Sequence, residues 1–245
     1  MLALLVVQHY RGSGPRYTTT RGARIVHYGA TIAVVPRRHG RLLIVLLHGR
    51  GSGPSQFLSN QLFTELNKPH APVVVLPNGG DHSYWHDRRD GNWGSLVLNH
   101  VIPDAQHRFH TRGKVAIGGI SMGGYGALHL ASLRPGEFCA VGGHSAAVWA
   151  SGGASAPGAF DDAADYARND VFAATSSLRE LPVWLDNGDH DPFLAADAQL
   201  ARALHITQHV WPGGHTSSYW NAHIARYLRF YVSACRMRPK RSAAM

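Results

Sequence analysis

The stretch of sequence that decides the fold is Lys114–Leu128, KVAIGGISMGGYGAL. It combines a short apolar strand, a tight turn rich in glycine and the start of a helix. Ser121 stands at the turn inside a Gly-x-Ser-x-Gly pattern, which is typical of a serine raised on a sharp strand-to-helix bend. Side chains at Gly119 or Gly123 would obstruct the packing of that helix on the strand. The pattern predicts a nucleophilic serine, which needs a base and an acid from elsewhere in the chain.

Apolar runs alternate with helical patterns along the rest of the chain. Apolar runs without polar alternation are typical of strands buried on both faces, and they occur at 42–47, 73–76, 115–117, 138–141, 183–185 and 206–211. Helices are expected at 92–109 (capped by Asn92 and bent at Pro103), 123–133, 195–204 and 219–231. We therefore predict an α/β fold with a mostly parallel sheet, helices on both faces and antiparallel edge strands within 23–35.

We expect three regions along the chain: an N-terminal extension or edge strand over 1–22, one α/β domain over 23–235 and a basic, disordered tail over 236–245. The apolar run 2–7 is too short for a membrane helix and lacks the basic residues that begin a signal peptide. It predicts a strand and a cytoplasmic protein. The segment 150–159 is rich in Gly, Ser and Ala and leads into 161–170, which predicts a mobile loop, a short helix and a small lid at most.

The chain has 245 residues with 24 Lys and Arg against 15 Asp and Glu, a formal charge of +9. The basic residues are scattered and form no recognisable nucleic-acid module, so we predict neither a nucleic-acid partner nor stable membrane insertion. Cys139 and Cys235 allow one disulfide at most. Because Cys139 lies in an apolar run, we expect it to be a small buried hydrophobic residue rather than a nucleophile.

The base that fits Ser121 best is His215. In this class of fold the order along the chain is Ser, then Asp or Glu, then His, and each partner sits in a loop after a strand. His215 follows the run 206–211 and the turn Pro212–Gly214, directly before the last helix. The chain has 17 histidines, so this position, rather than residue type, favours His215.

Three aspartates compete for the role of the acid after the run 183–185. Asp186 is still at the end of the strand and is expected to lie too deep. Asp191 follows a fuller loop and is stiffened by Pro192, so we favour it, with Asp189 as the rival. The unused aspartates are expected to cap the turn.

The oxyanion of the reaction needs two N–H donors. Met122 follows the serine and supplies one, and the loop His48–Gly53 after the first long strand is placed to supply the second from Arg50. This loop lacks the pattern of a phosphate-binding loop. Whether the Arg50 side chain meets solvent or an anionic group of the substrate stays open.

Several aromatic residues follow predicted strands and could line the substrate pocket, although such residues are as often plain packing: Tyr84, Trp85, Trp93, Phe193 and Trp220. Ser145 follows a strand but lacks a glycine two places on, so we expect a pocket wall or core residue. The histidine pairs 205/209 and 107/110 have no accompanying carboxylates or cysteines. We therefore predict no metal site and no cofactor.

Four motifs together resemble one known family: HGRG at 48–51, GISMGG at 119–124, GDHDPF at 188–193, and GGH at 213–215 with Tyr219 and Trp220. They are similar to the putative-esterase family of α/β-hydrolases, which includes esterase D (S-formylglutathione hydrolase), feruloyl-esterase-type enzymes and the mycolyltransferases of the antigen 85 complex. The resemblance spans roughly 23–231. It implies the α/β-hydrolase fold, a triad of Ser121, Asp191 and His215, and oxyanion amides at Arg50 and Met122.

The sequence thus predicts a serine esterase that cleaves a small-molecule carboxylic ester, or a thioester, through an acyl-enzyme on Ser121. Two alternatives stay open. The acyl group could pass to a sugar or another alcohol instead of water, or the scaffold could be a non-catalytic binder of an anionic glycan or lipid. The sequence does not indicate an oligomeric state.

Overall fold

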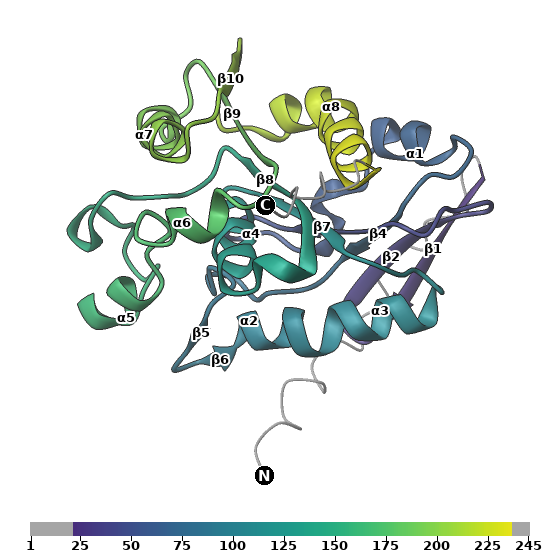
Figure 1. The fold of residues 1–245 in the computed structure, drawn as a ribbon, viewed down its shortest axis with the longest axis horizontal. Helices are drawn as coiled ribbons and strands as arrows, with labels where there is room; N and C mark the ends of the chain where they lie inside the picture. The colour runs from purple at the N-terminus through teal and green to yellow at the C-terminus, as the bar shows by residue number, and fades with distance from the viewer. Residues whose placement is uncertain (1–21, 237–245) are drawn as a thin grey trace, which may run out of the picture.

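An eight-stranded sheet runs through the part of the chain that the structure, a computed structural model, describes: residues 22–236 (Figure 1). The strand expected within 2–7 and the tail at 237–245 lie outside the described residues. The order of the strands is β1-β2-β4-β3-β7-β8-β9-β10. Their bounds are β1 Ala23–Tyr28, β2 Thr31–Pro36, β3 Leu43–Leu47, β4 Val73–Leu76, β7 Val115–Ile120, β8 Phe138–His144, β9 Val183–Gly188 and β10 Gln208–Trp211.

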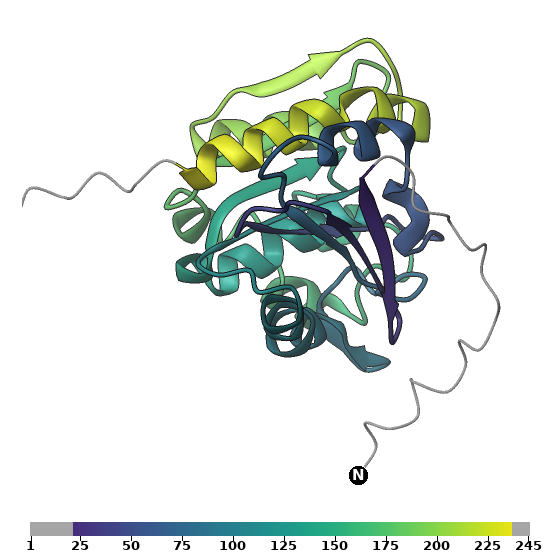
Figure 2. The same ribbon diagram turned by 90° about the vertical axis from the view of Figure 1, so that its right-hand side faces the viewer.

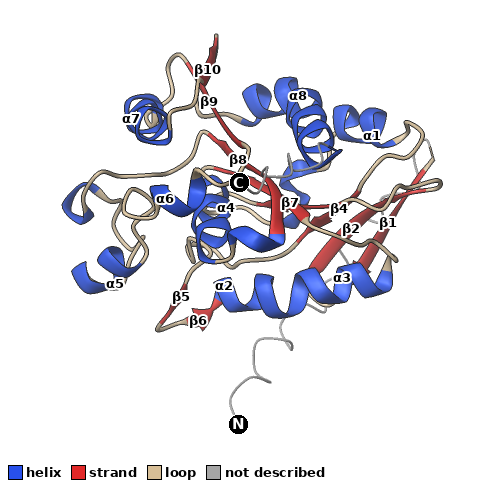
Figure 3. Ribbon diagram, in the orientation of Figure 1, coloured by secondary structure: helices blue, strands red, loops and turns tan. Residues whose placement is uncertain are grey.

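Most of the sheet is parallel. The pairs β3–β4, β3–β7, β7–β8, β8–β9 and β9–β10 are parallel, whereas β1 pairs antiparallel with β2 and β2 antiparallel with β4. The expected antiparallel edge is therefore present. Helices separate the successive parallel strands (Figure 3), as the alternation in the sequence predicts.

Each strand in the middle of the sheet contributes to two cores. In β3 the side chains of Leu43, Val45 and Leu47 pack on one face, while Ile44 and Leu46 pack on the other. All five are at most 1% exposed. This two-sided burial explains why the strand has no polar position.

Helices cover both faces of the sheet. α1 (Asn60–Leu66) and α8 (Ser217–Arg236) lie on one side and α3 (Ile102–Arg108) on the other (Figure 2). α8 buries an apolar stripe at helical spacing against the sheet: Tyr219, Trp220, Ile224, Tyr227, Leu228 and Tyr231. The remaining elements are η1 Pro54–Phe57, β5 Asp87–Arg88, β6 Gly91–Asn92, α4 Met122–Leu133, η3 Pro135–Glu137, η4 Gly152–Ala154, α5 Ala163–Arg168, α6 Thr175–Leu178 and α7 Leu194–Leu204.

The expected helix over 92–109 is interrupted by a π-helical turn. It consists of α2 (Trp93–Leu96), the turn η2 (Val97–Val101) and α3. Pro103 follows this turn and has no amide hydrogen for the carbonyl of Asn99, which favours an irregularity at this point. The side chain of Asn92 makes no capping hydrogen bond, so the predicted cap is wrong.

The segment 150–170 is fastened to the loop 81–90 and contains the expected short helix, α5. Arg88 binds the Asp161 carboxylate at 2.8 Å and donates to the Gly158 carbonyl at 3.0 Å. Arg89 forms an ion pair of 2.6 Å with Asp162. These contacts favour a fixed wall of the molecule over the mobile loop that the composition predicted.

A disulfide joins Cys139 at the start of β8 to Cys235 at the end of α8. Cys139 is half-buried, so the expectation of a small buried hydrophobic residue is wrong, whereas the one disulfide that the sequence allowed is present. The two cysteines are 96 residues apart, and no local pattern indicates that the last turn of α8 returns to β8. The disulfide closes a long loop and ties the C-terminal end of α8 to the sheet.

Loss of this disulfide should destabilise the fold. In the double variant Cys139→Ser/Cys235→Ser, the free energy of unfolding in urea should fall by about 2–4 kcal/mol, because the unfolded chain regains the freedom of the long loop. Reductant should lower the stability of the wild type by a similar amount and leave the double variant unchanged. Equal urea midpoints for oxidised and reduced wild type, with reduction verified by thiol titration, would contradict the structural role of this bond.

Candidate active site

Ser121 stands on a strained bend between β7 and α4. Its backbone has φ 55° and ψ −116°, a left-handed conformation that a non-glycine residue adopts only when its surroundings hold it there. The Ser121 N–H donates to the carbonyl of His144 at 3.0 Å, and the Ser121 carbonyl accepts from the Ala147 N–H at 3.0 Å. A Cβ atom at Gly123 would collide with the Leu47 carbonyl. The bend therefore requires the glycine that the sequence pattern indicated.

Ser121, His215 and Asp191 form one continuous chain of hydrogen bonds. The Ser121 Oγ lies 2.9 Å from His215 Nε2, and His215 Nδ1 lies 3.0 Å from Asp191 Oδ2. Since a carboxylate can only accept, Nδ1 carries the hydrogen and Nε2 accepts from the serine hydroxyl. The three residues follow the carboxyl ends of β7, β9 and β10, so the parallel sheet brings them to one edge.

Asp191 is held as a carboxylate by its neighbours. Its side chain is buried, and its Oδ1 accepts from the Phe193 N–H at 2.8 Å. Burial opposes ionisation of Asp191, but the hydrogen bonds from His215 and the Phe193 amide outweigh it and hold the pKa of this carboxyl below its ordinary value. Asp191 therefore carries its charge next to the imidazole over the neutral pH range.

The rival Asp189 has a different task. It is exposed, and its Oδ1 accepts from the Gly213 N–H at 2.9 Å and from His190 Nδ1 at 2.7 Å. These bonds fasten the turn that carries His215. Of the predicted residues, the structure thus places Asp191, and not Asp189, against His215.

Asp186 lies within a buried polar network, so its expected role as a turn cap is wrong. Its Oδ1 accepts from His144 Nδ1 at 2.6 Å and from Trp184 Nε1 at 2.8 Å. Its Oδ2 accepts from the hydroxyls of Tyr219 at 3.0 Å and Tyr227 at 2.8 Å. This network fixes α8 to the sheet directly after the loop of His215. The sequence missed it because its members are far apart along the chain.

The loop that contains Gly49 is held beside Ser121 by hydrogen bonds from the side chains of His48 and Gln56. The sequence analysis did not predict this role for either residue. His48 Nε2 accepts from the Gly79 N–H at 3.0 Å, and its Nδ1–H donates to the Gly49 carbonyl at 2.9 Å. Gln56 Oε1 accepts from the Gly49 N–H at 2.7 Å. Burial lowers the pKa of His48 and keeps this brace uncharged. A Cβ atom at Gly49 would lie only 3.4 Å from the Cβ of Ser121.

The two amides expected to bind the oxyanion are those of Arg50 and Met122. Within residues 22–236, neither of these N–H groups donates a hydrogen bond to another residue. Arg50 continues the braced loop beside Ser121, and Met122 begins α4. Arg50 is exposed, and its guanidinium donates to the Pro157 carbonyl at 3.2 Å.

Two of the five predicted pocket aromatics flank the imidazole of His215. The rings of Phe193 and Trp220 have their centroids 5.3 Å and 5.0 Å from the His215 ring. Phe193 is half-buried, and Trp220 is 7% exposed. These two are therefore the predicted aromatics that remain candidates for substrate contact.

The other three predicted aromatics lie elsewhere. Trp85 is 0% exposed and donates from Nε1 to the His48 carbonyl at 3.1 Å, so it is a core residue. Tyr84 is also buried and packs on Trp149. Trp93 is half-buried and donates to Asp90. The structure thus places Tyr84 and Trp85 in the hydrophobic core rather than in a pocket.

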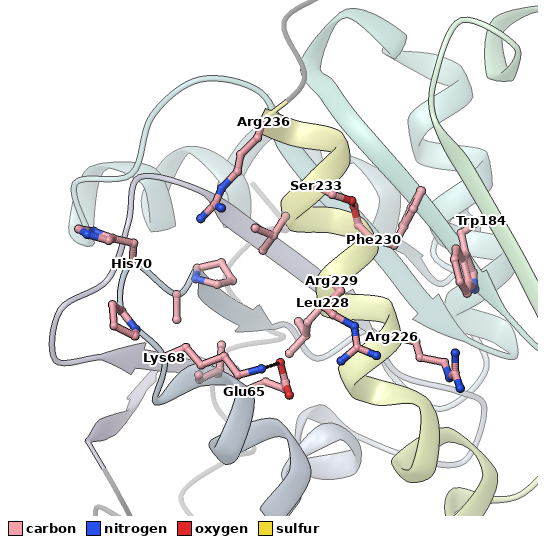
Figure 4. A pocket seen from close by; sticks show the side chains of 15 residues that line it. Glu65, Lys68, His70, Trp184, Arg226, Leu228, Arg229, Phe230, Ser233 and Arg236 are labelled. Carbon is pink, nitrogen blue, oxygen red and sulfur yellow. Dashed lines mark hydrogen bonds and ion pairs between the residues drawn. The ribbon is translucent and has the colours of Figure 1, made fainter.

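A cavity of about 890 Å³ lies between α1 and α8, away from Ser121 (Figure 4). Its lining includes the basic side chains of Lys68, Arg229 and Arg236, and Lys68 forms an ion pair with Glu65. It flanks the C-terminal half of α8, near the amino end of β8, whereas the hydrogen-bond chain of Ser121 lies at the carboxyl end of the sheet. This cavity is therefore distinct from the candidate active site.

Two further findings concern residues 22–236. No group of three or more His, Cys, Asp or Glu side chains in this range is placed to hold a metal ion. No helix in the same range is both long and apolar enough to cross a membrane.

Solved structures show what the fold is similar to. A ferulic acid esterase superposes with a TM-score of 0.71 at 18% identity, over 88% of this chain and 100% of that chain. An S-formylglutathione hydrolase from Agrobacterium tumefaciens superposes with a TM-score of 0.68 at 15% identity, over 89% and 98% of the two chains. These superpositions confirm the predicted α/β-hydrolase fold.

The family follows from the sequence match. The profile of the family described as putative esterase matches residues 35–231. The chain therefore belongs to this family, as its motifs predicted. An acetyl esterase from Caldicellulosiruptor saccharolyticus is 35% identical over 89 residues, a match that spans 35% of this chain and only 34% of that protein.

The two neighbouring aspartates provide a matched pair of variants. In Asp191→Asn, the charge that stabilises protonated His215 is lost, and the amide can select the wrong tautomer. The kcat/KM for p-nitrophenyl acetate should then fall by about 10⁴-fold. The exposed Asp189→Asn should lose less than about tenfold. Steady-state kinetics on both variants, with thermal unfolding as the control for folding, check this ranking; the reverse ranking would move the acid to Asp189.

Proposed function

We propose that this protein is a serine esterase that hydrolyses carboxylic esters through an acyl-enzyme on Ser121. The observation that carries the proposal is the hydrogen-bond chain from Ser121 Oγ to His215 (2.9 Å) and on to Asp191 (3.0 Å). A serine hydroxyl is a weak nucleophile at neutral pH, and a neutral imidazole within hydrogen-bond reach is the group that activates it. Family membership supports the same reaction class.

In the first half of the reaction, Ser121 Oγ attacks the carbonyl carbon of the ester, and its proton passes to His215 Nε2. The C=O π electrons move onto the oxygen, which becomes the oxyanion of a tetrahedral intermediate. The amides of Met122 and Arg50 donate to this oxygen. The intermediate then collapses as the bond to the alcohol oxygen breaks, and His215 gives its proton to the leaving alcohol.

In the second half, a water molecule attacks the acyl-enzyme. His215 Nε2 takes one proton of that water, and the resulting hydroxyl attacks the acyl carbon. The same amides hold the second oxyanion. The bond to Ser121 Oγ breaks, the serine regains the proton from His215, and the carboxylic acid leaves. The residues present supply every proton transfer, so the proposal needs no cofactor.

Asp191 stabilises the imidazolium in both halves. Its charge lies 3.0 Å from the imidazole Nδ1, and burial of the carboxylate strengthens the attraction because solvent screens it less. Its depressed pKa keeps it ionised when His215 is neutral and ready to act.

The proposed substrates are small-molecule esters. Similarity to an acetyl esterase and to a ferulic acid esterase supports the ester class, and similarity to an S-formylglutathione hydrolase supports thioesters as a second class. The mechanism accepts either, because only the leaving atom changes from oxygen to sulfur. A panel of esters that vary in the acyl and alcohol groups identifies the preferred substrate.

We also propose an oxidising compartment in place of the cytoplasm that the sequence predicts. The disulfide between Cys139 and Cys235 supports this location, since disulfides persist in extracellular, periplasmic and lumenal proteins and are rare in reducing compartments.

Removal of the nucleophile tests the proposal. Ser121→Ala should reduce kcat for p-nitrophenyl acetate by about 10⁴- to 10⁶-fold while the circular dichroism spectrum and thermal unfolding stay those of the wild type. A fluorophosphonate probe should label the wild type on the peptide that contains Ser121 and should fail to label the variant.

The matched control is Ser132→Ala, which alters a half-buried serine on α4 that bonds to the His129 carbonyl. This variant should retain full turnover and labelling. Undiminished turnover in Ser121→Ala would refute the assignment. A wild type that neither turns over the ester nor reacts with the probe would favour a non-catalytic binding protein on a hydrolase scaffold.

A further inference from the structure

The cavity beside α8 continues into a second cavity at the amino end of the sheet. Their volumes are about 890 Å³ and about 610 Å³. Both cavities are lined by His70, Pro72, Val232 and Arg236, so together they form one groove, which we call the amino-end groove. Its main walls are the C-terminal half of α8 and the three loops that lead into β3, β4 and β7.

The walls of the amino-end groove are tied to one another. The Arg112 N–H in the loop before β7 donates to the carbonyl of Arg41 in the loop before β3, at 3.0 Å. The disulfide between Cys139 and Cys235 is part of the lining and ties α8 to this end of the sheet. The groove is therefore preformed, so a ligand binds it without ordering its walls.

Basic side chains dominate the charge of the amino-end groove. Figure 4 shows two of them, Arg229 and Arg236 on α8, across the first cavity from Lys68. Among the described residues of the lining, the one acidic side chain is Glu65, and Lys68 pairs with it at 2.6 Å. Seven Arg and Lys residues line the groove, and all are exposed: Arg41, Lys68, Arg112, Lys114, Arg226, Arg229 and Arg236.

Most of this positive charge has no acidic partner. Within residues 22–236, six of the seven basic side chains form no ion pair, Lys68 being the exception. Residues 1–21 and 237–245 contain no Asp or Glu, so no acidic side chain there can neutralise the groove. Like charges around one concave surface raise the local positive potential, which attracts anions.

We propose that the amino-end groove binds a linear polysaccharide that carries carboxylates. Five of the seven basic residues are arginines, and a planar guanidinium group can hold a carboxylate through two parallel hydrogen bonds. Basic side chains line both cavities, which fits a chain with repeated anions better than one small anion. The inference goes beyond the proposed function and does not depend on Ser121.

An anionic membrane fits the groove less well than a polysaccharide does. A membrane presents a broad surface and takes up apolar side chains from the proteins that lie on it. The groove is concave, and the exposed large apolar residues of the described chain, Leu133 and Val210, lie outside its lining.

Nucleic acid is also disfavoured. Single strands bind largely by stacking their bases on aromatic side chains. The Trp184 and Phe230 rings of the lining are half-buried and pack on each other, with centroids 5.3 Å apart. The oxidising compartment proposed above favours a polysaccharide as well, because acidic polysaccharides are abundant outside cells.

The groove and the candidate active site lie at opposite ends of the parallel strands. The groove borders the loops that lead into β3, β4 and β7, whereas Ser121 and His215 follow the carboxyl ends of β7 and β10. Binding at the groove therefore retains the protein on the polymer without blocking Ser121.

The test is the binding of a fluorescently labelled polygalacturonate oligomer to the disulfide-bonded protein, followed by fluorescence anisotropy. The wild type should bind at low ionic strength and lose affinity as salt is added, because salt screens exposed charges. The double variant Arg112→Gln/Arg229→Gln removes one charge from each cavity. Its Kd should be higher than that of the wild type by about tenfold. Neutral dextran should not compete with the oligomer.

The matched control is Arg24→Gln/Arg202→Gln, which lowers the net charge by the same amount. Arg24 on β1 and Arg202 on α7 are exposed and lie outside the lining of the groove. This variant should keep its Kd within about twofold of the wild type, because solvent and salt screen distant charges. Both double variants should unfold at the wild-type temperature, since all four arginines are exposed.

Failure of the wild type to bind the oligomer at low ionic strength, or equal weakening in the two double variants, would overturn the proposal. Tighter binding of phosphatidylglycerol vesicles or of DNA than of polygalacturonate would also overturn it, because the occupant would then belong to another class. Ser121→Ala should bind the oligomer as the wild type does. A wild type that binds the oligomer but has no esterase activity rejects the proposed function alone, and an active wild type that does not bind rejects the groove alone.

Discussion

The hydrogen bond between Ser121 Oγ and His215 Nε2 is the contact on which the rest of the account depends. It joins residues 94 positions apart in the sequence at a distance of 2.9 Å. No local element can bring such residues together. The parallel sheet does so because the carboxyl ends of its strands meet at one edge. The strain at Ser121, the glycine-rich turn before His215 and the burial of Asp191 all serve the geometry of this contact.

The placement of α8 is the second requirement, since the loop of His215 leads directly into this helix. Asp186 is wholly buried, and burial of an isolated carboxylate is costly. Four donors, from His144, Trp184, Tyr219 and Tyr227, satisfy it, and two of them lie on α8. The disulfide at Cys235 fixes the other end of the same helix. The helix is therefore tied to the sheet at both ends, which holds its preceding loop in register with Ser121.

Much of the fold and of the candidate active site could be predicted from the sequence, because the patterns that indicate them are local. The bend at Ser121 depends on the glycines two positions away on either side. The unbroken apolar run of β3 predicts that this strand is buried on both faces. The order of the motifs along the chain, with the serine first and the histidine last, favoured Asp191 as the acid and His215 as the base. By contrast, no sequence pattern marks the hydrogen bonds by which His48 and Gln56 hold the loop beside Ser121. Trp85 shows the same limit, since only its burial in the folded structure shows that it is a core residue.

The most direct test of the central claim is to trap the covalent intermediate. The enzyme is mixed with p-nitrophenyl acetate, quenched with acid during the first turnover and digested, and its peptides are measured by mass spectrometry. The account predicts one acetyl group on the peptide that contains Ser121, formed at the rate of the initial p-nitrophenol release and lost at the rate of steady-state turnover. Acetyl transfer to a different residue at those rates, or turnover with no acylated Ser121 under single-turnover conditions, would contradict it.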